Sequence, residues 1–160
     1  MKRFIKILLW VATLVWMWII FLFSAQNAQV SSNQSGTVIH TILSVLDSSF
    51  ESLSLVEQEA RIETLQYVVR KLAHMSVYGV LGILCMGALL THRMRSGLRP
   101  LVAFGICVFY AFSDEWHQTF VPGRSGELRD VCFDSLGAFL GILLVFIIWK
   151  MIQYQKKPRR

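Results

Sequence analysis

Residues 131–149 read VCFDSLGAFLGILLVFIIW, a stretch that is apolar almost throughout. An α-helix rises about 1.5 Å per residue, so about 20 such residues cross the roughly 30 Å of bilayer hydrocarbon. Three other apolar stretches of similar length occur at residues 4–23, 72–90 and 100–116. Hydrophobic residues make up 54% of the 160-residue chain, and its mean hydropathy is +0.51. These features predict an all-α integral membrane protein, a bundle of four transmembrane helices.

The first apolar stretch follows Met1-Lys2-Arg3, an arrangement that also occurs in secretory signal peptides. Its apolar core is longer than the roughly 7–15 residues of a signal sequence, and the Phe23-Ser24-Ala25 that follows is a poor cleavage site. We therefore expect this stretch to be retained as the first span. No soluble second domain is visible, so we expect one membrane domain over residues 1–160.

Basic residues are concentrated in three segments that alternate with the spans: the N-terminus, the loop between the second and third spans, and the tail. If the four spans are correct, these segments share one side of the membrane, which the positive-inside rule makes cytoplasmic. All acidic residues then lie on the extracellular side. The net charge of +6 therefore indicates topology and contact with anionic lipid, not nucleic-acid binding. The basic residues concerned are Lys2, Arg3, Lys6, Arg93, Arg95, Arg99, Lys150, Lys156, Lys157, Arg159 and Arg160.

The outer segment between the first two spans is expected to be partly helical. Residues 24–36 are rich in Ser, Gln and Asn, which is typical of an exposed segment. Residues 37–50 have apolar side chains at helical spacing and predict a short helix lying on the membrane. Ser54 and Glu57 fit a capping box, and a helix that starts there would continue through Arg70 into the second span.

A polar cluster lies at the outer end of the third span. Residues 110–124 read YAFSDEWHQTFVPGR and place a serine, two adjacent carboxylates, a histidine and a glutamine at the end of an apolar run. An ionisable side chain at membrane depth costs roughly 2.5–3.5 kcal/mol, so several together predict a functional site.

Helical spacing places polar side chains on one face of each of the last three spans, because residues three, four and seven apart share a face. All of them lie toward the outer ends of their spans, so we predict that they converge at one depth on the extracellular side. The pair Gly137 and Gly141 permits the close helix approach that this requires. The three faces carry Lys71, His74 and Tyr78; Tyr110, Asp114 and His117; and Asp130 and Asp134.

Acid/base chemistry is one use of such a cluster. His117 would act as the acid or base, assisted by Asp114 or Glu115. The Val121-Pro-Gly turn would place Arg124 as an anion clamp, with Lys71 as a second positive charge. The candidate substrate-binding residues are Lys71, His74, Tyr78, Gln118, Arg124, Asp130 and Asp134.

Other uses of the cluster stay open at this point. His74, His117, Asp114 and Glu115 could ligate a divalent metal, although no local motif fixes the ligands, so a metal cofactor is not favoured. The cluster could also bind a lipid headgroup or relay protons without covalent chemistry. A purely structural alternative is that Lys71, Arg70 and Arg124 pair with the carboxylates and hold the bundle together.

Three motifs resemble the VanZ-like family: RKLAHMSVYGVLG at 70–82, YAFSDEWHQTFVPGR at 110–124 and DVCFDSLGA at 130–138. The FSAQ at 23–26 is similar to that family's first short motif. The resemblance covers nearly the whole chain and implies a small polytopic protein that acts on or near the outer leaflet of the cell envelope. The family's namesake is associated with teicoplanin resistance in Gram-positive bacteria, so a contribution to glycopeptide resistance is an expectation. The resemblance implies no reaction, substrate or metal.

The leading hypothesis is a multi-pass cell-membrane protein whose outer-leaflet polar pocket binds or processes a lipid-linked or phosphate-bearing envelope molecule. Its partners would be the lipid bilayer and an envelope substrate or a glycopeptide. One alternative is a non-catalytic membrane factor that alters antibiotic access or escorts an envelope partner. Another is a small transporter. The position of the polar groups argues against it, because they cluster at one end of the spans instead of at mid-depth.

Overall fold

The computed structural model describes residues 2–156, and all regular secondary structure within them is helical. The all-α prediction is therefore confirmed. Met1 and the tail residues Lys157, Arg159 and Arg160 lie outside the described residues. The elements are α1 (Lys2–Ser24), α2 (Ala28–Leu46), the short 3-10 helix η1 (Phe50–Ser52), α3 (Leu55–Leu90), α4 (Leu98–Gln118) and α5 (Leu128–Gln155).

Three of these helices, α1, α3 and α5, are long and apolar enough to cross a membrane. Helix α4 has 21 residues, which is sufficient length, but it is not among the three. It is less apolar because Arg99 lies near its first turn and Asp114 and Glu115 near its last. Three of the four predicted spans thus have the expected character, and the third span remains a prediction.

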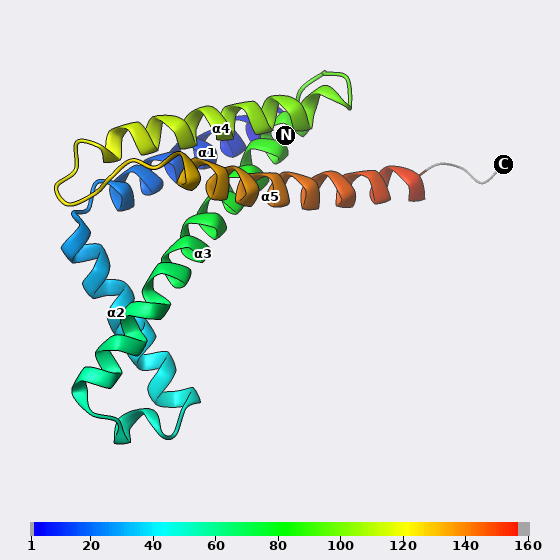
Figure 1. Ribbon diagram of the computed structural model, residues 1–160. Coiled ribbons are helices and arrows are strands. Elements are labelled where there is room, and N and C mark those ends of the chain that lie inside the picture. The colour runs from blue at the N-terminus through cyan, green and yellow to red at the C-terminus, as the bar shows by residue number, and fades with distance from the viewer. Residues whose placement is uncertain (1, 157–160) are drawn as a thin grey trace.

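The bundle consists of α1, α4, α5 and the C-terminal half of α3, while α2 and the N-terminal half of α3 project from it as a helical hairpin (Figure 1). Helix α3 packs most extensively against α5 and also contacts α1, α2 and α4. It is therefore the element that joins the hairpin to the bundle. At 36 residues it is about 54 Å long, well beyond the roughly 30 Å of hydrocarbon.

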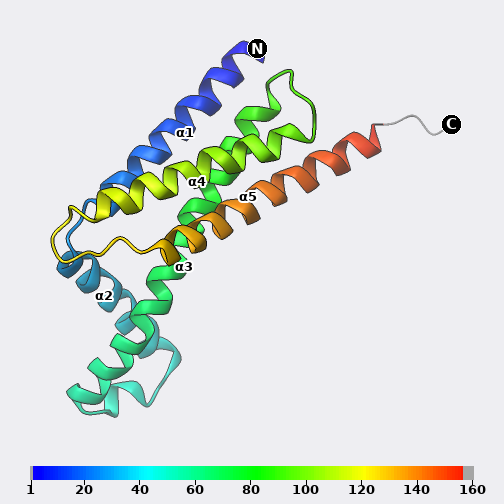
Figure 2. The ribbon, with the colours of Figure 1, turned by 45° about the horizontal axis from the view of Figure 1, so that its top comes forward.

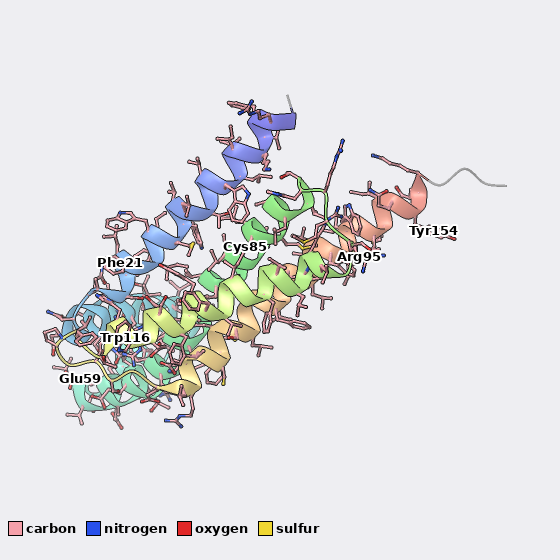
Figure 3. The ribbon with its side chains drawn as sticks, turned by 90° about the horizontal axis from the view of Figure 1, so that it is seen from above. Phe21, Glu59, Cys85, Arg95, Trp116 and Tyr154 are labelled. Carbon is pink, nitrogen blue, oxygen red and sulfur yellow. The ribbon has the colours of Figure 1, made fainter. Side chains whose placement is uncertain are left out.

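The two ends of the bundle differ in what they carry. The N-terminus, the α3–α4 loop and the last turns of α5 lie toward one end, and the α1–α2 junction and the α4–α5 loop lie toward the other (Figure 2). Arg95 and Tyr154 mark the first end, Trp116 marks the second, and Cys85 lies between them in the core (Figure 3). The described parts of the basic segments are therefore together, as predicted. The side of the membrane that they face is still a prediction.

Glycines allow α3 and α5 to cross in backbone contact, which confirms the prediction made from Gly137 and Gly141. A Cβ atom on Gly137 would lie 2.0 Å from the Met75 carbonyl oxygen, and one on Gly141 would lie 2.0 Å from that of Gly79. A Cβ atom on Gly82 of α3 would lie 2.3 Å from the Ala138 carbonyl oxygen of α5. Any side chain at these positions would force the two helices apart, so the crossing fixes how both helices are rotated.

The predicted start of α3 is confirmed. The Ser54 backbone N–H donates to Glu57 Oε2 at 3.0 Å, and the Glu57 N–H donates to Ser54 Oγ at 3.4 Å, so both halves of the capping box are present. From there the helix continues without interruption into the second apolar stretch. The start of this helix could be predicted from the sequence because the capping box involves residues only three positions apart.

The predicted start of the preceding helix, at Thr37, was wrong, since α2 begins at Ala28. Contacts with α3 stabilise the added turns: Gln66 Nε2 donates to the Ser32 carbonyl oxygen at 3.1 Å, and Ser32 Oγ donates to Gln66 Oε1 at 3.3 Å. Ile39, only 2% exposed, is the most deeply buried of the described α2 side chains. Tertiary contacts thus outweigh the weak helix propensity of a Ser- and Asn-rich segment.

Candidate functional site

Three carboxylates are buried at the end of the bundle that carries the α4–α5 loop. Asp114 is 3% exposed, Glu115 5% and Asp134 1%. Asp114 and Glu115 lie on the last turns of α4, and Asp134 lies on the second turn of α5. Buried carboxylates are rare and need partners, so the groups around them define the site.

Ser24 connects the end of α1 to this cluster. Its Oγ donates to Asp114 Oδ2 at 2.7 Å, and both side chains are buried. Ser24 was not among the predicted site residues, although its position in the FSAQ motif was an available signal. Since the two residues are 90 positions apart, no helical spacing could have revealed the bond.

Gln118 holds the carboxylates of α4 and the following loop together. Its Nε2 donates to Asp114 Oδ2 at 3.3 Å and to Glu115 Oε1 at 3.2 Å, and its Oε1 accepts from Arg124 Nη1 at 2.9 Å. Glu115 Oε2 also accepts from the backbone N–H of Glu127 at 3.0 Å. The α4–α5 loop is thereby folded back over the end of α4.

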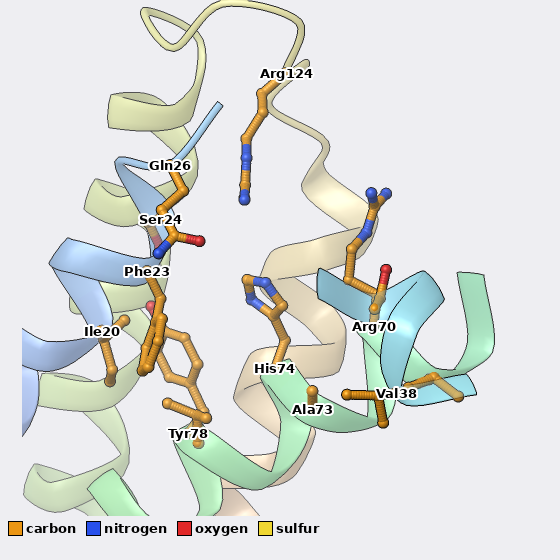
Figure 4. Close-up of a pocket in the computed structure, with 13 residues that line it drawn as sticks. Ile20, Phe23, Ser24, Gln26, Val38, Arg70, Ala73, His74, Tyr78 and Arg124 are labelled. Carbon is orange, nitrogen blue, oxygen red and sulfur yellow. The ribbon is translucent and has the colours of Figure 1, made fainter. Parts of the chain in front are cut away.

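Arg124 reaches this position through the predicted turn at Val121-Pro-Gly, which is confirmed. The Arg124 N–H donates to the Val121 carbonyl oxygen at 3.1 Å, and Gly123 has a φ of 76°, a conformation that favours glycine. The guanidinium is half-buried and points toward the ring of His74 (Figure 4). Burial and the neighbouring Arg70 both lower the pKa of Arg124 from its usual value.

Two further pairs join α3 to the start of α5. Lys71 Nζ and an Asp130 oxygen form an ion pair, which fits the structural alternative for that lysine. His74 Nδ1 lies 4.0 Å from Asp134 Oδ1, too far for a hydrogen bond. Both Asp134 oxygens lack a hydrogen-bond partner among the described residues. Unpaired buried polar atoms are uncommon, and perturbed ionisable groups of this kind cluster at functional sites.

Two adjoining cavities lie beside these groups. The smaller, the polar cavity, has a volume of about 110 Å³ and is lined mainly by Arg70, Lys71, His74, Gln118, Arg124 and Asp130. The larger, the apolar cavity, has a volume of about 340 Å³, lies between α1, α2 and α3, and is lined by Ile20, Phe23, Val38, Ala73, Val77 and Tyr78 among others. Arg70, His74 and Arg124 line both cavities and therefore mark the boundary between them.

Most of the predicted site residues come together at this boundary. Lys71, His74, Gln118, Arg124 and Asp130 line the polar cavity, and Tyr78 lines the apolar one. The carboxylates of Asp114, Glu115 and Asp134 are buried in the adjoining helices. Asp114 and Glu115 accept hydrogen bonds from Gln118, and Asp134 lies beside His74.

His117 is placed differently from the other predicted residues. Its ring packs against Phe21 of α1, with the ring centroids 4.7 Å apart, and neither cavity is lined by it. His117 Nδ1 is buried and has no hydrogen-bond partner among residues 2–156. The histidine that faces both cavities is His74.

The side chains named for the metal alternative, His74, His117, Asp114 and Glu115, do not form one cluster in the described structure. Within the described part of the chain, no three or more His, Cys, Asp or Glu side chains are arranged to hold a metal ion. The two histidines of the predicted ligand set have different neighbours, since His74 lies beside Asp134 and His117 lies on Phe21.

The fold and the site thus define a helical membrane protein with a buried polar site at one end of its bundle. A family model described as VanZ/LLP1 matches residues 9–149, and the chain belongs to this family. The match confirms the resemblance and includes every residue of the site. Comparison with curated proteins and with solved structures gave no match.

Proposed function

We propose that this protein binds a phosphate-bearing or lipid-linked envelope molecule at the boundary between its polar and apolar cavities. The observation that carries the proposal is the position of Arg70, His74 and Arg124, which line both cavities. Among the described residues neither arginine lies within 4.0 Å of a carboxylate, whereas Lys71 is paired with Asp130. A guanidinium without an acidic partner can give two parallel hydrogen bonds to a phosphate.

We further propose that the site faces the extracellular side of a multi-pass cell-membrane protein. In this topology α4 is the third of four spans, residues 1–160 form one membrane domain, and both chain ends are cytoplasmic. The clustering of basic residues at the other end of the bundle supports this orientation through the positive-inside rule. A substrate of the outer leaflet would then reach the site directly.

If binding leads to a reaction, we infer that His74 is the group that exchanges a proton with the bound molecule. It faces both cavities, and the Asp134 carboxylate beside it can orient the ring. Their 4.0 Å separation is compatible with this role, since catalytic hydrogen bonds are often long before substrate binds. His117, assisted by Asp114 or Glu115, is the competing assignment made from the sequence.

The proposal is tested by comparing Arg124→Gln with Arg129→Gln in a glycopeptide-sensitive Gram-positive host. Arg129 is the matched control because it is an exposed arginine five residues away that pairs with Glu127 and lines neither cavity. We expect the wild type and Arg129→Gln to raise the minimum inhibitory concentration of teicoplanin and Arg124→Gln to lose this effect at equal protein abundance. Equal effects of both variants would contradict the proposed site.

The same assay separates the two histidines. We expect His74→Gln to lose the effect on teicoplanin susceptibility and His117→Gln to retain it. The opposite result would assign the acid/base role to His117, as the sequence suggested. Loss in neither variant would mean that binding requires no proton transfer from a histidine.

A non-catalytic membrane factor is the second candidate function. The observation that favours it is the tip of the α2–α3 hairpin, where Val45, Leu46, Leu55 and Val56 are 76–79% exposed. An exposed apolar tip of this kind is typical of a surface that contacts a partner or a membrane. Full activity of Arg124→Gln and His74→Gln in the susceptibility assay would favour this function over the cavity site.

A further inference from the structure

The apolar cavity changes character along its length (Figure 4). Arg124 and Gln26 lie in the upper part of the view with the His74 ring directed toward them, and Ile20, Ala73 and Val38 lie below. The cavity volume of about 340 Å³ is within the roughly 300–1,000 Å³ of cavities that bind small molecules. One end therefore offers hydrogen-bond donors and positive charge, and the other offers apolar walls.

The charges of this cavity are unbalanced. Its lining includes Arg70, Arg124 and His74 but no aspartate or glutamate. Apolar walls alone would suit any hydrocarbon, and two arginines alone would suit any anion. Their combination in one cavity suits a molecule that has an anionic head and a hydrocarbon chain.

The cavity is also open at its side. Phe23 of α1 and Val38 of α2 form part of its wall and are still 54% and 51% exposed, so the space between these helices is accessible from outside the bundle. Helix α1 is one of the helices that can span the membrane, so hydrocarbon would surround its outer face. A chain could pass from the bilayer into the cavity without crossing water.

We propose that the ligand is a lipid phosphate, held with its hydrocarbon chain in the apolar cavity and its phosphate at Arg70 and Arg124. This inference rests on the proposed function and specifies how the ligand is recognised. The polar cavity, which shares both arginines, is then the space for whatever the phosphate carries. A soluble phosphate ester would use only the polar end.

The test compares three probes on the purified full-length protein by native mass spectrometry. They are dioleoyl phosphatidic acid, dioleoylglycerol, which has the same chains without phosphate, and inorganic phosphate. In the variants Ala73→Trp and Val38→Trp an indole enters the apolar cavity from α3 or from α2. Leu72→Trp is the matched control, because Leu72 is 54% exposed and lines neither cavity.

We expect phosphatidic acid to bind the wild type and the Leu72→Trp control more tightly than dioleoylglycerol does. Each cavity-filling variant should bind phosphatidic acid about tenfold more weakly or worse, because the indole occupies the space of the hydrocarbon chain. The binding of inorganic phosphate should be unchanged. Two variants on different helices, α3 and α2, keep the test decisive if one of them fails to fold.

Two results would overturn the inference, and they differ in what they say about the proposed function. Unchanged phosphatidic acid binding in every folded cavity-filling variant, together with weaker binding in Arg124→Gln, would refute the chain position and leave the phosphate site standing. Equal binding of phosphatidic acid and dioleoylglycerol would refute both the inference and the phosphate site.

Discussion

Asp134 is a buried residue whose side chain is expected to destabilise the folded protein. Its side chain is 1% exposed, and neither oxygen has a hydrogen-bond partner among the described residues. Burial of a polar group without a partner costs roughly 1–3 kcal/mol by mutational measures. His74, whose Nδ1 lies 4.0 Å from Asp134 Oδ1, faces both cavities. The site therefore retains a destabilising group where a ligand or a proton would meet it.

Replacement of Asp134 by leucine, which has the same branched shape, should stabilise the protein. We expect a gain of about 1–2 kcal/mol, since apolar replacements of buried charged groups are often stabilising. Function should be lost at the same time. Thermal unfolding followed by tryptophan fluorescence would measure the first effect, and teicoplanin susceptibility the second.

Asp130→Leu is the control for this prediction, because it removes the partner of Lys71, whose side chain is only 12% exposed. It should destabilise the protein by about 1–2 kcal/mol, less than for a fully buried pair because Asp130 is 26% exposed. A loss of stability in Asp134→Leu would show that the Asp134 carboxylate contributes to the fold.

At the level of elements, the crossing of α3 and α5 holds the site together. It brings Lys71 to Asp130 and His74 to Asp134, and it depends on glycines whose backbones touch. A change at the crossing would therefore move both pairs at once. The hairpin formed by α2 and the start of α3 has a different role, since it supplies Val38 to the apolar cavity.

Gly141→Ala should destabilise the protein by about 1–3 kcal/mol, because the added methyl would lie 2.0 Å from the Gly79 carbonyl oxygen and the helices would have to separate. Gly105→Ala in α4 is the matched control, since no atom beyond the neighbouring backbone of its own helix lies within 4 Å of the added Cβ. That variant should be neutral or more stable by about 0.5–1 kcal/mol, the usual gain from alanine in a helix interior. Thermal unfolding in detergent measures both, and equal behaviour would contradict a packing role for Gly141.

At the level of the whole molecule, the two ends of the bundle are chemically distinct. One end carries most of the basic residues in segments that are short and exposed, and the other carries the buried carboxylates and both cavities. The hairpin projects from the second end (Figure 1). This division is the basis of the proposed orientation, in which the basic end lies in the cytoplasm and the cavities face the outside.

Cysteine labelling on intact cells tests this orientation. In a Cys132→Ala background, Ser125→Cys in the α4–α5 loop should react with a membrane-impermeant thiol reagent, and Ser96→Cys in the α3–α4 loop should react only after permeabilisation. Both serines are exposed, so accessibility within the protein is matched. The natural Cys85 and Cys107 are buried and should contribute little background. The reverse labelling pattern would refute the topology and with it the outward-facing site.

The apolar runs, the capping box at Ser54 and Glu57, the turn before Arg124 and the close approach at Gly137 could all be predicted, because each depends on residues within a few positions of one another. The family could be recognised for the same reason, since its motifs are short and contiguous.

Other features depend on contacts between distant parts of the chain. The Ser24–Asp114 bond and the apolar cavity bring together side chains from different helices, and the early start of α2 depends on Gln66. The orientation of His117 toward Phe21, away from the cavities, also depends on a contact between distant parts of the chain. Helical spacing says which residues share a face, but the packing of α3 on α5 sets where each face points. Because the rotation of a helix follows from its neighbours, the histidine that lines the cavities could be identified only from the packed structure.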